Sequence, residues 1–171
     1  MTIADPLYTD WLHQQIRIKP DQLAVNDLSA ERSFTWQQLN DRVDALAHRL
    51  IHEGIAPGDR IAYLGLNSSD VIEIFFAAIR IGAIYVPLNF RLTASELTYI
   101  LGDCAPTAVF YDQAFKAVIG DIDANAMPHL TIETTLDGRD SAYERCMMTN
   151  EPALQAIPAN GDTLSMIMYS S

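Results

Sequence analysis

The stretch over residues 60–101 constrains the fold more than any other part of the chain. It alternates two short apolar runs, Ile61–Leu66 and Ala83–Leu88, with two segments that carry helix start signals, Asp70–Ile81 and Thr93–Leu101. The second helical segment opens with a capping box, in which a Thr is followed three residues later by a Glu. Strands that alternate with helices over short joints are typical of βαβ units, and therefore of a parallel sheet.

The helical segment Asp70–Ile81 is apolar on nearly all of its faces. A helix without a wide polar face is expected to be buried. We therefore expect this helix to form the centre of the core, beside the two strands that flank it in the sequence.

The chain before residue 60 predicts a helix, a hairpin and a second helix. Apolar residues at helical spacing predict a helix over Asp5–Pro20, and two short strands, Leu23–Val25 and Arg32–Phe34, flank a polar turn. A capping box at Thr35 then opens the clearest helix in the sequence, which Gly54 ends.

The chain after residue 101 contributes further short elements. We expect a strand at Thr107–Tyr111, a helix at Ala114–Ile119, a strand near Leu130–Ile132, a helical turn after Ser141 and a strongly apolar central strand at Thr163–Tyr169. The fold class that these elements predict is α/β, a mostly parallel sheet flanked by helices.

Length and charge exclude several classes of protein. A chain of 171 residues is long enough for one domain with a real core. Its net charge is −11 and its basic residues form no cluster, so electrostatic repulsion argues against nucleic acid as a partner.

Targeting and membrane signals point to the cytoplasm. The first ten residues do not have the basic start and apolar core of a signal peptide. The most apolar window contains Glu73, Arg80 and Pro87, so we expect no transmembrane segment. Cys104 and Cys146 have no metal-site spacing and are interpreted as reduced thiols.

Several ordered motifs resemble those of one enzyme family. Phe34–Leu39 (FTWQQL) and Ile81–Asn89 (IGAIYVPLN) resemble the first two core motifs of the AMP-binding, adenylate-forming enzymes, and Arg91-Leu92-Thr93 continues in the manner of their acyl-CoA synthetases. Tyr169-Ser170-Ser171 resembles the opening of the Gly-rich phosphate-binding loop of that family.

The resemblance implies a fold and a function. Residues 1–171 would be the N-terminal part of the large AMP-binding domain, cut at the phosphate-binding loop. The parent would be an acid–CoA ligase that uses ATP, Mg²⁺ and CoA to activate a fatty or aryl acid. Ser170 and Ser171 would then bind ATP phosphates, and Arg91 a phosphate of CoA. The resemblance assigns no catalytic residue and no metal ligand to this chain, which alone should be inactive and bind no ligand.

Two other interpretations remain open from the residues. The chain could be a stand-alone α/β interaction or regulatory module, or a fragment of an amino-acid adenylation domain. The residues that follow Ser171 would separate the module from both enzymes. If the chain is a fragment, a sheet buried on both faces in the parent should leave apolar surface open near Leu164–Met168, and we expect self-association.

Overall fold

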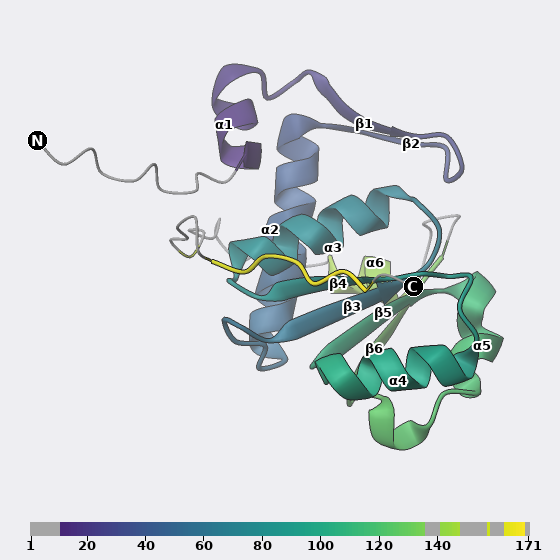
Figure 1. Ribbon diagram of the computed structural model, residues 1–171. Helices are drawn as coiled ribbons and strands as arrows, with labels where there is room; N and C mark the ends of the chain where they lie inside the picture. Colours follow the sequence, from purple (N-terminus) through teal and green to yellow (C-terminus); the bar gives the residue numbers. More distant parts are fainter. Residues whose placement is uncertain (1–10, 136–140, 148–156, 158–162, 170–171) are drawn as a thin grey trace, which may run out of the picture.

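The centre of the molecule is a four-stranded parallel sheet. The structure, a computed structural model, describes residues 11–135, 141–147, 157 and 163–169 (Figure 1). The strands β3, β4, β5 and β6 lie in the order β4-β3-β5-β6, and every pair in the sheet is parallel. Their bounds are Arg60–Leu64, Ile84–Leu88, Ala108–Asp112 and Leu130–Thr134. The predicted α/β fold with a parallel sheet is confirmed.

Helical crossovers connect the strands and cover both faces of the sheet. The connections use α3 (Ser69–Arg80) between β3 and β4, α4 (Ala94–Cys104) between β4 and β5, and the short η1 (Gln113–Phe115), α5 (Lys116–Gly120) and η2 (Ala124–Ala126) between β5 and β6. Figure 1 shows α2 (Trp36–His52) and α3 on one face of the sheet and α4 on the other. The short helix α6 (Ala142–Cys146) packs on the same face as α2 and α3.

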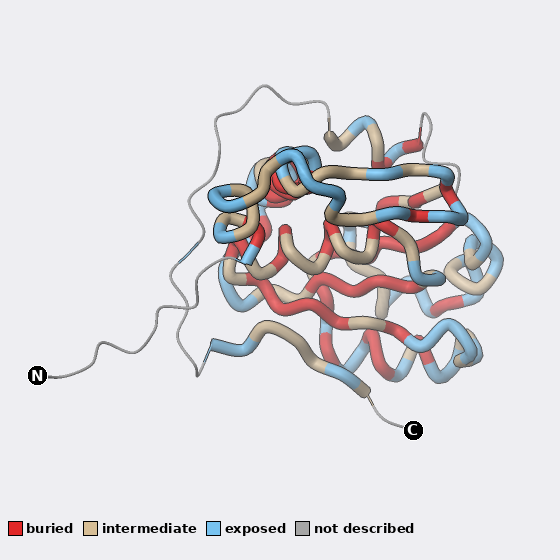
Figure 2. The backbone as a smooth tube through the Cα atoms, turned by 90° about the horizontal axis from the view of Figure 1, so that it is seen from above, coloured by how far each residue is buried: buried red, intermediate tan, exposed pale blue. Residues whose placement is uncertain are grey.

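Alternate residues of β3 and β5 enter two separate apolar cores. Ile61, Tyr63 and Phe110 pack toward α2 and α3, whereas Ala62, Leu64 and Val109 pack toward α4. This division follows from the two-residue period of a strand. Figure 2 shows the sheet strands as the most continuously buried part of the chain. Because both faces are covered, the strands read as nearly unbroken apolar runs in the sequence.

Local sequence signals set the beginnings of α2 and α4. The side chains of Thr35 and Thr93 each accept a hydrogen bond from the backbone N–H three residues on, and the side-chain oxygens of Gln38 and Glu96 accept one from the backbone N–H of the cap residue. Both predicted capping boxes are confirmed. In each case two backbone donors that the helix cannot satisfy obtain partners within one turn of chain.

The N-terminal elements form a layer outside the sheet. The helix α1 (Trp11–Ile18) leads into the antiparallel hairpin of β1 (Leu23–Asp27) and β2 (Arg32–Thr35), and both lie beside α2 at the top of Figure 1. The predicted hairpin is confirmed. The predicted helix began at Asp5, and residues 5–10 lie outside the described residues.

The start of α3 differs from the prediction by one residue, for a tertiary reason. The helix begins at Ser69, and its N-cap residue, Ser68, makes no side-chain capping bond. The carboxylate of Asp27, on β1, instead accepts from the backbone N–H of Ser69 at 2.7 Å. A cap supplied from another element leaves no signature within the helix sequence.

Charged side chains of α3 are buried as deeply as its apolar ones. Asp70, Glu73 and Arg80 are each at most 2% exposed, although the prediction that this helix is buried rested on its apolar residues. Each has an oppositely charged partner on another element: Arg32 for Asp70, Arg42 for Glu73 and Asp44 for Arg80. Burial of these charges is tolerated because each is paired.

The apolar segment over residues 163–169 lies at the margin of the described sheet rather than at its centre. It makes one parallel bridge, between Tyr85 of β4 and Met166, with hydrogen bonds from Tyr85 N to Ser165 O and from Ile167 N to Tyr85 O. The next backbone group of β4 on this side belongs to Pro87, which has no N–H to donate, so the ladder stops. Figure 2 shows the segment beside the buried strands, with exposed residues along it. Within the described residues, the prediction of a central strand is wrong.

No helix in the part of the chain that the structure describes has the length and apolar character needed to cross a membrane.

Candidate functional site

Exposed cations and aromatic side chains lie at the carboxyl edge of the sheet, in the segments that follow the strands. Because β3, β4 and β5 are parallel, the loops after Leu64, Leu88 and Asp112 leave from the same edge. The segment over residues 163–169 is also parallel to β4 and ends there. In open parallel sheets this edge is where ligands bind.

An aromatic pair joins the loop after β4 to the short helix η1, which follows β5. The rings of Phe90 and Phe115 lie 5.9 Å apart at an angle of 47°. Phe90 is 40% exposed, and the guanidinium of Arg91 lies 5.5 Å from its ring centroid. The Asn89 side chain accepts from the backbone N–H of Arg91 at 3.0 Å, which holds this turn in place. The edge therefore presents an exposed cation beside an accessible aromatic face.

A second exposed cation, Lys116, is the residue directly after Phe115 in the sequence. The ammonium of Lys116 lies 2.9 Å from the carboxylate of Glu133 on β6, and the Tyr111 hydroxyl donates to the same carboxylate at 3.0 Å. The hydrogen bond with Lys116 lowers the pKa of Glu133, and the Glu133 carboxylate raises the pKa of Lys116. The Lys116 side chain is 67% exposed, so two of its three N–H donors can reach a ligand.

A glycine at the end of β3 makes room for a tyrosine hydroxyl. A Cβ at Gly65 would overlap the Tyr63 hydroxyl, which donates to the Leu66 carbonyl at 3.0 Å. The same Cβ would lie 3.0 Å from the Cβ of Asp112 on β5. The close approach of these three residues at the edge requires glycine.

A cavity of about 400 Å³ lies between α4 and the end of the segment over residues 163–169. Its walls include Asn89, Leu92, Tyr99 and Tyr169. The hydroxyl of Tyr169 donates to the carboxylate of Asp103 at 2.6 Å, which fixes that ring along α4.

The structure places one of the three site residues predicted from the sequence. Arg91 is exposed at the carboxyl edge, whereas Ser170 and Ser171 lie outside the described residues. The segment over residues 163–169, which precedes the two serines in the sequence, makes a parallel bridge with β4, the strand that precedes Arg91.

The sequence reasoning missed Phe115 and Lys116. Their position directly after the predicted strand Thr107–Tyr111 was the available signal, because loops that follow parallel strands share one edge.

Comparison with known proteins decides the family. The model of the family described as "AMP-binding enzyme" matches residues 12–171, which is nearly the whole chain. The chain belongs to this family of AMP-binding enzymes. The resemblance inferred from the motifs is thereby confirmed.

Two of the curated relatives are named as CoA ligases. The chain is 36% identical over 162 residues to the long-chain-fatty-acid–CoA ligase FadD13 of Mycobacterium tuberculosis, covering 94% of this chain and 31% of that protein. It is 33% identical over 167 residues to the indoleacetate–CoA ligase of Aromatoleum aromaticum, covering 95% and 32%. This AMP-binding protein therefore spans about a third of the length of the curated relatives that it matches.

Solved structures agree with this assignment. The fatty acyl-CoA synthetase of Mycobacterium tuberculosis superimposes with a TM-score of 0.81 at 34% identity, over 95% of this chain and 32% of the other. An inhibitor-bound N-terminal domain of FACL13 from the same organism gives a TM-score of 0.82 at 31% identity, over 95% and 40%. The sheet and its flanking helices are thus those of adenylate-forming acyl-CoA synthetases.

Proposed function

We propose that this chain is the N-terminal part of the large domain of an ATP-dependent acid–CoA ligase. In such an enzyme a carboxylate oxygen attacks the α-phosphorus of ATP and releases pyrophosphate, which gives an acyl-adenylate. The thiol of CoA then attacks the acyl carbon and releases AMP. A fatty or aryl acid is the proposed substrate, because fatty-acid and indoleacetate ligases are among the relatives.

The observation that supports the CoA half of the proposal is the contact between Phe90, which follows β4, and Phe115, which follows β5. CoA ends in an adenine ring and phosphates, so its nucleotide needs an aromatic face and cations. Phe90 and Phe115 supply the face, and Arg91 and Lys116 supply the cations, on a chain whose net charge is −11. We propose that Arg91, with Lys116, binds the phosphates of CoA.

The ATP half of the proposal depends on residues at and beyond the end of the chain. Ser170 and Ser171 would donate hydrogen bonds to ATP phosphates, as the first hydroxyls of a phosphate-binding loop. Within the described residues no group of three or more His, Cys, Asp or Glu side chains is arranged for a metal. We propose that Mg²⁺ is held by the ATP phosphates and by residues outside the described part of the chain.

The test uses the full-length protein and separates the two half-reactions. Pyrophosphate exchange into ATP reports adenylation and does not need CoA, whereas thioester formation does. We expect exchange with fatty or aryl acids, and we expect Arg91→Ala to raise the KM for CoA about tenfold, the loss of one charge-assisted contact, with exchange unchanged.

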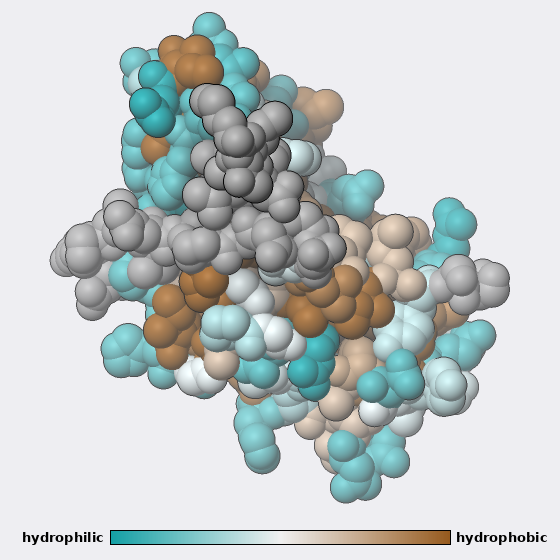
Figure 3. Space-filling view, turned by 60° about the vertical axis from the view of Figure 1, so that its left-hand side comes forward, coloured by the Kyte–Doolittle hydropathy of each residue, from teal (hydrophilic) through white to brown (hydrophobic). Residues whose placement is uncertain are grey.

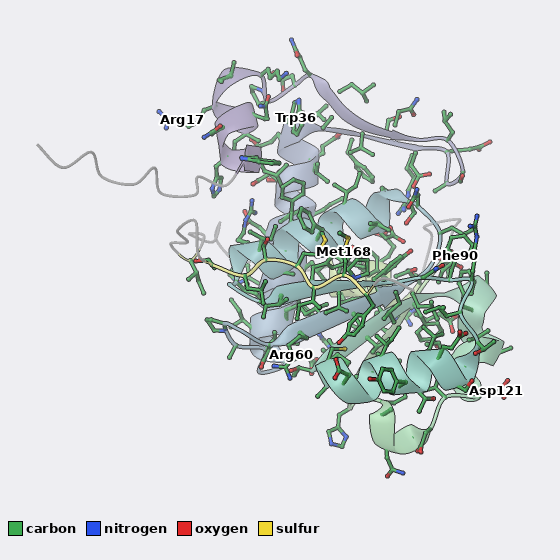
Figure 4. The ribbon with its side chains drawn as sticks, in the orientation of Figure 1. Arg17, Trp36, Arg60, Phe90, Asp121 and Met168 are labelled. Atoms are coloured by element: carbon green, nitrogen blue, oxygen red, sulfur yellow. The ribbon has the colours of Figure 1, made fainter. Side chains whose placement is uncertain are left out.

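A matched control is available on the opposite side of the molecule. Figure 4 shows Arg17, on α1, far from Phe90, so Arg17→Ala removes the same charge without touching the edge. Equal KM values for CoA in Arg91→Ala and the unaltered enzyme would contradict the role of Arg91. Exchange with amino acids instead would favour an amino-acid adenylation domain, and no exchange with any acid would favour a non-enzymatic module.

The proposal also covers the isolated chain. We propose that it is inactive and binds no ligand by itself, because the remaining loop and motifs of the family lie outside it. We propose further that it self-associates through its exposed apolar surface. The two free thiols, Cys104 and Cys146, accord with a cytoplasmic location.

A further inference from the structure

A groove separate from the carboxyl edge lies among the N-terminal elements. Its volume is about 450 Å³, and α1, β1, α2 and α3 all contribute walls. Trp11, Trp36, Leu39, Ile72 and Phe76 form most of its apolar lining. These two tryptophans are the only ones in the chain.

The groove has both exposed apolar side chains and a polar acceptor that a ligand could contact. Trp11 is 58% exposed, and Trp36, Ile72 and Phe76 are only partly buried. Figure 3 shows mostly hydrophilic residues at the top of the molecule, where α1 and the hairpin lie, with a few separate apolar residues among them. Gln15 also lines the groove, and its Oε1 is a buried acceptor without a hydrogen-bond partner in the described structure. An occupant should therefore bring apolar side chains and an N–H or O–H donor.

We propose that residues 1–10 of this chain occupy the groove, with Leu7 as the apolar anchor. The segment lies outside the described structure and is joined to Trp11, which is itself a wall of the groove. Ten residues span at most about 35 Å, so the segment can reach the whole groove. Its attachment gives it an effective concentration of the order of millimolar, which a free partner must exceed.

The composition of the segment suits the groove. Ile3, Leu7 and Tyr8 are apolar or aromatic, and Asp5 and Asp10 are its only charged side chains. The rim of the groove carries a cation, since the ammonium of Lys19 lies 5.7 Å from the centroid of the Trp36 ring. An acidic, apolar segment is therefore complementary to this site, and the inference does not depend on the ligase function.

Fluorescence of Trp36 tests the proposal. In a Trp11→Phe background the emission comes from Trp36 alone, which lines the groove and is distant in sequence from residues 1–10. We expect deletion of residues 2–10, and separately Leu7→Asp, to shift the Trp36 emission to the red and to raise its acrylamide quenching constant. Thr9→Asp places the same charge in the same segment and should leave both values near those of the parent.

Each outcome decides the question. A cooperative melt and an unchanged far-UV circular dichroism spectrum establish that each variant is folded, and the full-length Leu7→Asp variant remains informative if the deletion is not. Equal quenching in the parent, the deletion and Leu7→Asp would overturn the proposal. Quenching that falls with rising protein concentration would also overturn it, because a second copy would then fill the groove.

Discussion

The guanidinium of Arg42, on α2, makes two hydrogen bonds to the carboxylate of Glu73, on α3, at 2.6 and 3.0 Å. Glu73 is 0% exposed, and Arg42 also donates to Glu144 on α6 at 2.7 and 2.9 Å. The hydroxyl of Tyr143 donates to Glu73 at 2.8 Å. This network fixes three helices to one another on one face of the sheet.

The first prediction concerns the Arg42–Glu73 pair. Glu73→Gln removes the charge and keeps the shape, so Arg42 loses one of its two carboxylate partners within a largely buried site. We expect the free energy of unfolding to fall by about 3 kcal/mol, the range for breaking one partner out of a buried ion pair. Urea denaturation followed by circular dichroism measures this change.

Glu53→Gln is the matched control. Glu53 pairs with Arg49 one helical turn away, and their side chains are 33% and 48% exposed. Exposed pairs contribute less than about 1 kcal/mol, so the control should stay close to the parent. Equal losses in the two variants would show that burial of the Arg42–Glu73 pair does not matter.

The second prediction concerns Asp70 and pH. Burial raises the pKa of Asp70 to about 6 from an ordinary value of 3.8, although Arg32 donates to its carboxylate at 2.7 Å. The folded protein then binds this proton more tightly than the unfolded chain does. The contribution of Asp70 to stability is therefore present below the unfolded pKa and is lost as pH rises through the folded one.

Asp70→Asn removes this pH dependence. Between about pH 4 and 6, the unfolding free energy of Asp70→Asn should rise relative to the parent by an amount of the order of 2 kcal/mol. Asp121→Asn, the same change at an exposed residue, should show no such trend. A difference that falls with rising pH would mean that the ion pair with Arg32 outweighs desolvation.

The elements that the sequence predicted correctly are those whose signals are local. The capping boxes at Thr35 and Thr93 lie within one turn, and the apolar runs of β3 and β4 report burial on both faces of the sheet. The buried charges could not be predicted in the same way. Arg42 and Glu144 are 102 residues apart, and only the packed fold brings them together.

In the candidate site, too, some features have local sequence signals and others depend on the packed fold. Arg91 was accessible to sequence reasoning because a motif surrounds it. The contact between Phe90 and Phe115 depends on which strands end side by side, and a sequence does not state the order of strands in a sheet. The marginal position of the segment over residues 163–169 was missed for this reason too.

The third prediction uses two glycines with opposite environments. Gly65→Ala should lower the free energy of unfolding by about 1–3 kcal/mol, because the new Cβ overlaps the Tyr63 hydroxyl and crowds Asp112. Gly102→Ala, within α4, meets no atom within 4 Å and should raise it by about 0.5–1 kcal/mol. Thermal and urea melts of both variants measure the change in the free energy of unfolding. If both variants were destabilised, the steric explanation would be refuted.

The last prediction concerns self-association of the isolated chain. Ser165 and Ile167 bond to β4, so the intervening backbone groups of Met166 point away from the sheet. Leu164 and Met168 are 53% and 74% exposed, and Figure 4 shows Met168 on this outer segment. An apolar strand edge without charged residues is a template for pairing with a second copy.

Met168→Lys places a charge on that edge and should reduce the mean particle mass measured by light scattering at matched concentrations. Leu28→Lys, at an 81% exposed residue between β1 and β2, removes a similar apolar side chain elsewhere and should leave the association unchanged. The prediction would be refuted if the isolated chain without substitutions were a monodisperse monomer with a cooperative melt. Equal reduction by both substitutions would instead show that the edge over residues 163–169 is not the specific site of association, because both variants remove an exposed apolar side chain and add the same charge.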